Sequence, residues 1–245
     1  MVHLTKNDFL DIKDEIKEGR LSPDSIRFYL TAFMVFSGIA IGIAYMAANS
    51  YNSVIGWGNL SIFWKTIFWL EAALFLLQLI LIFLVKGKSN WSQIVLNVCY
   101  VIYAYKMVLD PFVAMSMFAK NDGVYEAFAP VFVVIIIVGF LFHLYLIWRS
   151  FKDLKEKKNR KKKKKKKGNI MYALIPILFL LVSITGYIIK NELLGENDIL
   201  FGTGIFTFLY IAVMIGAVEF VMGAYCVIRF PSFRVNPPST KKKNA

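Results

Sequence analysis

The chain has 245 residues, of which 58% are hydrophobic and 18% are charged, and its mean hydropathy is +0.57. Soluble domains are usually about half apolar and about a quarter charged. The composition therefore excludes an ordinary soluble protein and favours an integral membrane protein. The formal net charge of +13 does not indicate a nucleic-acid protein, because the basic residues are gathered in short segments between apolar runs.

Residues 1–27 form a charged segment that precedes the first apolar run. Within this segment, Phe9, Ile12 and Ile16 share one face of a short amphipathic helix that we predict over residues 5–19. The segment has no apolar stretch or cleavage site of a secretory signal, so we expect it to be retained. Two interpretations of the helix stay open, a solvated helix beside the membrane and a helix that docks on the rest of the chain.

Six segments are long and apolar enough to cross about 30 Å of hydrocarbon as helices. They cover residues 28–48, 61–85, 92–118, 126–148, 170–189 and 199–228. The runs are far longer than the strands of a membrane barrel and lack their alternation of apolar and polar residues. We therefore predict an all-α fold, a polytopic bundle with spans 1 to 4 in residues 28–148 and spans 5 and 6 in residues 170–228.

The basic residues predict the orientation of these spans, because Lys and Arg are retained in cytoplasmic loops. With the N-terminus inside, 25 of the 29 basic residues lie on the cytoplasmic side. They fall in residues 1–27, in a short connection after span 2, in a loop over 149–169 and in a tail over 229–245. We predict a plasma-membrane protein with both termini and the basic loop in the cytoplasm.

Four of the ionisable residues within the apolar runs are candidates for a functional site, because charge is expensive there and usually faces a protein interior. Glu71 lies near the middle of span 2, and Glu219 lies in span 6. In span 3, Lys106 and Asp110 are four residues apart and form a predicted ion pair. The adjacent Pro111 is expected to kink or break that helix. We predict that Glu71, Lys106, Asp110 and Glu219 converge on one polar cavity that binds a substrate, a cation or a proton.

Glycines at helical spacing mark predicted contacts between the spans. Gly38 and Gly42 form a GxxxG pattern in span 1. In span 6, Gly216 and Gly223 share a face with Glu219, so another helix is expected to approach this carboxylate closely.

The loop over 149–169 ends in an uninterrupted basic run from Arg160 to Lys167. This basic run contains no apolar residues that would form a core, and we expect the loop to contact anionic lipid headgroups or an acidic protein partner. The candidate contacts are Arg160, Lys161, Lys164 and Lys167. Nucleic acid is not expected as a partner, because no aromatic residue interrupts the run to stack on bases.

No hydrolase, zinc-site, nucleotide-binding or dinucleotide-binding motif occurs in the sequence. We therefore predict no catalytic residue, metal or cofactor. Three functions stay open. The first is a permease or transporter component with buried carboxylates. The second is a non-enzymatic membrane scaffold, immunity or regulatory protein whose basic loop binds lipid or an acidic partner. An intramembrane enzyme that acts on a lipid ranks last, because no nucleophile or metal set accompanies the carboxylates.

Overall fold

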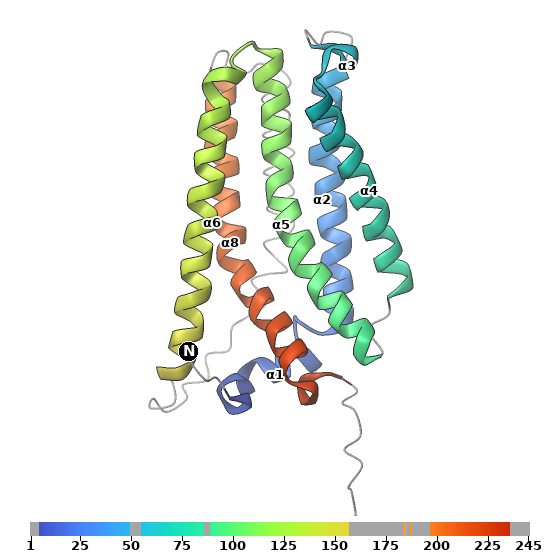
Figure 1. Cartoon of the computed structure of the whole chain (residues 1–245), viewed down its shortest axis with the longest axis vertical. Helices are drawn as coiled ribbons and strands as arrows, with labels where there is room; N and C mark the ends of the chain where they lie inside the picture. The colour runs from blue at the N-terminus through green and yellow to red at the C-terminus, as the bar shows by residue number, and fades with distance from the viewer. Residues whose placement is uncertain are drawn as a thin grey trace, which may run out of the picture.

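The computed structural model describes residues 5–49, 55–85, 89–156, 184, 187 and 197–235. Every regular element within these ranges is a helix. In chain order they are η1 (Lys6–Phe9), α1 (Leu10–Lys17), α2 (Pro23–Asn49), α3 (Gly56–Asn59), α4 (Ile62–Leu84), α5 (Asn90–Asn121), α6 (Tyr125–Glu156), α8 (Asp198–Arg229) and η4 (Pro231–Phe233). Figure 1 shows the long helices in one bundle, with α1 across one end and α3 at the other. We call these the α1 end and the α3 end.

Five helices in the described ranges are long and apolar enough to cross a membrane, namely α2, α4, α5, α6 and α8. They coincide with five of the six predicted spans, so the prediction of an all-α protein with membrane-type helices is confirmed. The predicted span over 170–189 lies outside the described residues. Helix α6 runs eight residues past the predicted end at residue 148, because Phe151 and Leu154 continue its apolar face and pack against the core.

The least apolar of the five helices lies at the centre of the bundle. Over its best 18-residue window, α5 has a mean hydropathy of 1.4, against 2.5 for α4 and 2.7 for α6. Helix α5 packs against α2, α6 and α8, whereas α4 and α6 leave long rows of Ile, Leu, Val and Phe exposed. This distribution is expected when lipid surrounds the bundle, because polar side chains then avoid the outer surface.

Helices α6 and α8 run in the same direction. Tyr210 Oη donates to the carbonyl oxygen of Ile136, and further along both helices His143 contacts the carbonyl oxygen of Met214. Residue numbers therefore rise together along the contact between the two helices. Figure 1 agrees, since both helices start near the α3 end and finish near the α1 end. The chain leaves α6 at one end of the bundle and enters α8 at the other.

Pro111 lies inside α5 without ending it. The sequence predicted a kink or a break at Pro111, and the helix continues from Asn90 to Asn121, so it does not break there. Pro111 removes only its own N–H, and the surrounding helices hold both halves of α5 in place: Phe112 on the far side of the proline packs against Phe132 and Tyr210.

The N-terminal segment, residues 5–22, docks on the α1 end of the bundle. Its side chains Phe9, Ile16 and Leu21 are buried. The Phe9 ring lies 5.6 Å from the rings of Tyr225 and Phe230, measured between centroids. The sequence left open whether this helix is solvated beside the membrane or docked on the rest of the chain. In the structure it is docked.

Candidate functional site

Lys106 lies between two carboxylates in the interior of the bundle. Its Nζ contacts the Glu71 carboxylate and lies 2.9 Å from Asp110 Oδ2. The exposed fractions of the three side chains are 12% for Glu71, 9% for Lys106 and 1% for Asp110. We call these three residues the triad, and they form the candidate site.

Three helices supply the triad and its immediate partner. Lys106 and Asp110 come from successive turns of α5, and Glu71 comes from α4. Ser37 of α2 completes the group, because its hydroxyl donates to Asp110 and accepts a hydrogen bond of 2.5 Å from Lys106 Nζ. Next to Ser37, Gly38 lets the Phe75 ring of α4 approach, and a Cβ at this position would lie 3.3 Å from that ring. The local sequence of α2 thus combines a polar contact with a close approach to α4.

The triad has two acidic groups for one basic group. With both carboxylates ionised and Lys106 protonated, its net charge would be −1. Isolated charge is costly in a low-dielectric interior, and an ion pair offsets this cost only when the charges balance and the remaining polar atoms are hydrogen-bonded. The site therefore has a physical preference for one additional positive charge.

The triad lies next to two hydrophobic clusters. Towards the α3 end, α4 contributes Trp64 and Phe68 to a cluster with Ala114 and Met117 of α5. The main core includes Tyr29, Leu96 and Tyr100 towards the α1 end, and it continues past the triad to Phe112 and Met115 of α5. Apolar packing thus surrounds the triad at both ends.

Glu219 does not join the triad. Its carboxylate pairs instead with Arg20 of the N-terminal segment, with 2.6 Å between Glu219 Oε1 and Arg20 Nη2. The four ionisable residues that the sequence predicts to share one cavity are therefore divided, with three in the triad and Glu219 near the α1 end. Sequence analysis did not identify Arg20 or Ser37 as members of these groups.

The four predicted packing glycines have different surroundings. A Cβ built at Gly223 would lie 2.7 Å from Leu21 Cδ1, and one at Gly38 would meet Phe75 as described above. At Gly42 and Gly216, no described atom lies within 4 Å of such a Cβ. The closest approach in α6 is at Gly139, where a Cβ would overlap the Tyr210 ring. Gly139 was not predicted, because it belongs to no GxxxG pattern.

His143 is a second buried polar group. It lies well inside α6, which extends to Glu156, and it is fully buried. Its Nδ1 donates to the Met214 carbonyl oxygen at 2.7 Å, so in the neutral ring Nε2 accepts from the Tyr105 hydroxyl, also at 2.7 Å. His143 thereby links α5, α6 and α8.

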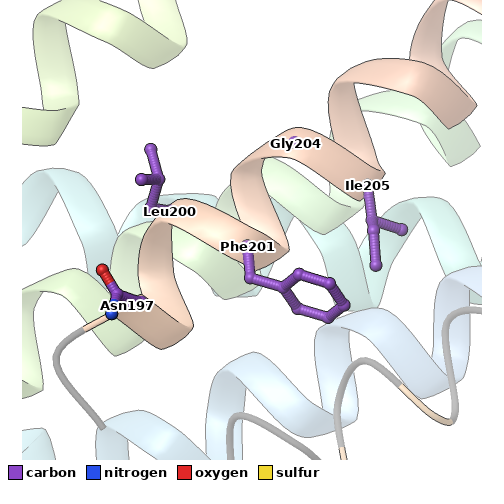
Figure 2. Close-up of a pocket in the computed structure, with 5 residues that line it drawn as sticks. All are labelled: Asn197, Leu200, Phe201, Gly204 and Ile205. Carbon is purple, nitrogen blue, oxygen red and sulfur yellow. The ribbon is translucent and has the colours of Figure 1, made fainter. Parts of the chain in front are cut away.

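An open hollow of about 500 Å³ lies beside the first turns of α8. Figure 2 shows its lining, which consists of Asn197, Leu200, Phe201, Gly204 and Ile205. None of these side chains is ionisable, and none belongs to the triad. The hollow is therefore not part of the candidate site.

The basic residues Arg160, Lys161, Lys164 and Lys167 lie outside the described residues. Within the described ranges, no three His, Cys, Asp or Glu side chains are grouped in a way that could hold a metal ion.

No protein-family model, curated protein or solved structure matches the chain. The function must therefore be argued from the triad and its surroundings.

Proposed function

We propose that this chain is a permease, or the membrane subunit of one, whose triad binds and releases a proton during transport. One observation carries the proposal: Glu71, Lys106 and Asp110 meet inside the bundle with two carboxylates for one ammonium group. Ionisable residues within spans are rare and usually mark substrate, ion or proton pathways. A merely structural ion pair needs only one carboxylate, and the second one requires its own explanation.

A proton fits the site better than a larger cation. Lys106 Nζ contacts both carboxylates and Ser37 Oγ, and so it occupies the position among the oxygens that a metal cation would take. A proton supplies the missing positive charge without displacing the ammonium group. Movement of a proton between Glu71 and Asp110 would then change the partner of Lys106 and the attraction between α4 and α5.

The proposal includes six crossings of the membrane. Five helices in the described ranges have the required length and composition. Since α6 and α8 are parallel, the chain between Glu156 and Asn197 has to return from the α1 end to the α3 end. A crossing by the predicted span over 170–189 would satisfy this requirement and bring both termini to the same side.

We place the α1 end in the cytoplasm of a plasma-membrane protein. Arg20, Arg27, Arg149 and Arg229 lie in or beside elements at this end. The concentration of basic residues at the α1 end supports a cytoplasmic position for this end under the positive-inside rule. The basic run from Arg160 to Lys167 would lie on the same side, where it would contact anionic headgroups at about 1 kcal/mol per residue.

Proton movement in liposomes tests the proposal. The purified full-length chain is reconstituted with a trapped pH-sensitive dye, and a pH gradient is imposed with and without the small-molecule fraction of a cell extract. We expect the parent to move protons in at least one condition. Glu71→Gln and Asp110→Asn should reduce this movement to the level of protein-free liposomes, because each removes a titrating carboxylate. Glu126→Gln, a first-turn acid of α6 outside the triad, is the control and should match the parent.

A non-enzymatic membrane scaffold or regulatory protein is the second candidate. It is favoured by the hydrogen bonds that Asp110 already receives from Ser37 and Lys106, and by the apolar faces of α4 and α6 that partner helices could cover. Under this alternative, the triad is a packing element. Its neutral variants would lower the abundance of folded protein, and proton movement would be absent from parent and variants alike.

A further inference from the structure

One face of α4 carries a row of polar contacts from the triad to the α1 end. The row consists of Glu71, Leu74, Gln78 and Ile82, which recur at the helical spacing of three or four residues. Leu74 contributes its carbonyl oxygen, which accepts a hydrogen bond of 2.8 Å from Tyr103 Oη. Eleven residues separate Glu71 from Ile82, so the row is roughly 16 Å long at 1.5 Å per residue.

The lower half of the row lies against α2. Gln78 Nε2 donates to the carbonyl oxygen of Leu30 at 2.8 Å. At the last turn of α4, Arg27 donates from Nη2 to the Ile82 carbonyl oxygen at 2.9 Å. This carbonyl is one of the last four of the helix, which have no partner within the helix backbone. The row thus begins at a charged guanidinium group near the α1 end and finishes at the triad.

Helix α4 contacts α5 through side chains, some of them along this row. Backbone packing is close between α2 and α5 and between α2 and α4, but sparse between α4 and α5. The contacts that join α4 to α5 include Tyr103 to Leu74 and Lys106 to Glu71. Figure 1 shows α2 and α5 together and α4 on the outer side of α2. Polar groups therefore form part of a contact in which the two backbones are not closely packed.

Gln78 has an acceptor that needs a donor. Its side chain is 1% exposed, and no described residue donates a hydrogen bond to Gln78 Oε1. A buried amide oxygen without a partner is unfavourable, and water is the smallest molecule that supplies a donor and passes it on. Gln78 lies midway along the row, between the contact of Arg27 with Ile82 and the triad.

The opposite side of the triad is apolar and aromatic. Trp64 and Phe68, on the same face of α4, are buried. The Phe68 ring lies 5.5 Å from the Trp57 ring, and the Trp64 ring lies 6.0 Å from that of Tyr125. No comparable row of polar contacts joins the triad to the α3 end in the described part of the chain.

We infer that the row from Arg27 to Gln78 and Tyr103 is a hydrated access path, through which protons reach the triad from the α1 end only. The inference rests on the proposed function for what the path carries, but the hydration of the path is tested separately. Gln78 is a positioning residue in this path: its amide holds a water and does not itself take up the transported proton.

Thiol labelling from each side of the membrane tests the path. In a full-length background with Cys99→Ala and Cys226→Ala, Gln78→Cys is compared with Phe68→Cys, the matched buried position on the same face of α4. A small, charged methanethiosulfonate reagent is added to either side of oriented vesicles. We expect Gln78→Cys to react at least about tenfold faster from the α1 end than Phe68→Cys from either end, because only a hydrated thiol forms the reactive thiolate.

Three results would overturn the inference. The first is an unreactive Gln78→Cys in protein of normal abundance. The second is a Phe68→Cys that reacts from the α3 end as fast as Gln78→Cys reacts from the α1 end. If Gln78→Cys does not accumulate, Leu74→Cys takes its place, because this position is one turn nearer the triad. The third overturning result is a Leu74→Cys that does not react with the reagent. Labelling of Gln78→Cys together with parent-like proton movement in Glu71→Gln and Asp110→Asn would contradict the proposed function while leaving the path in place.

Discussion

Arg20 and Glu219 are 199 positions apart in the sequence, yet Arg20 Nη2 donates a hydrogen bond of 2.6 Å to Glu219 Oε1. This contact ties the N-terminal segment to α8 at the α1 end. It lies beside the contact of Leu21 with Gly223 and the burial of Phe9 among the aromatic rings of Tyr225 and Phe230. The N-terminal segment is thus held by one ion pair and a larger apolar contact.

The apolar contact should contribute most of the docking energy. Phe9→Ala removes a fully buried ring, and we expect a loss of about 3 to 5 kcal/mol in docking free energy. Trypsin should then cleave at Lys13 and Lys17 much faster than in the parent. Leu10→Ala, at a neighbouring exposed position, is the control and should leave cleavage unchanged. Equal protection in Phe9→Ala and the parent would show that the ring does not hold the segment.

The Arg20–Glu219 pair should have a smaller effect. Both side chains are partly exposed, and such pairs typically contribute about 0 to 1 kcal/mol. We expect Arg20→Met to raise trypsin cleavage at Lys17 only slightly in low salt and not at all in high salt. Cleavage as fast as in Phe9→Ala would contradict this division of the docking energy.

Close packing of α6 against α8 depends on Gly139. A Cβ there would overlap the Tyr210 ring. The Tyr210 side chain is buried, and its hydroxyl group donates a hydrogen bond to the Ile136 carbonyl oxygen, so the ring has little freedom to move. We expect Gly139→Ala to destabilise the protein by about 1 to 3 kcal/mol and to lower its melting temperature in detergent. Gly216→Ala has open space around it and should be neutral or slightly stabilising. Equal melting temperatures for the two variants would contradict the contact.

Removal of the ammonium group from the triad should be destabilising. Lys106→Met leaves two buried carboxylates without their counter-ion, and loss of one partner from a buried pair typically costs about 3 to 5 kcal/mol. Adding Glu71→Gln and Asp110→Asn should restore part of the stability. Lys120→Met, which removes a lysine stacked on Tyr125 outside the triad, should cost less than Lys106→Met. A triple variant no more stable than Lys106→Met would show that the charges are not coupled.

The sequence predicted local relations better than long-range ones. The pairing of Lys106 with Asp110 follows from their spacing on one helix, and the structure has it. Glu71 meets this pair only because of how α4 is aligned along α5. Helical periodicity predicts which residues share a face of one helix, but it does not predict the alignment of two helices. Glu219 looks like Glu71 in sequence, since each is an acid in an apolar run, yet its partner lies in the N-terminal segment.

Residues of ordinary type were the ones that sequence analysis missed. Ser37 is one of many small polar residues in apolar helices, and its role appears only once Asp110 and Lys106 lie beside it. Gly139 lacks a second glycine at helical spacing, so no motif marks it. Gln78 shares a face of α4 with Glu71, but its bond to Leu30 depends on how α2 crosses α4.

Protonation of the triad is the central claim, and infrared difference spectroscopy of the purified chain in lipid nanodiscs tests it most directly. Spectra of the parent, recorded across a pH titration, should contain a band from a protonated carboxyl group that shifts in deuterated water. We predict that this band is lost in the Glu71→Gln, Asp110→Asn double variant and kept in Glu219→Gln. Identical titration spectra for the parent and the double variant would contradict the claim that the triad takes up a proton.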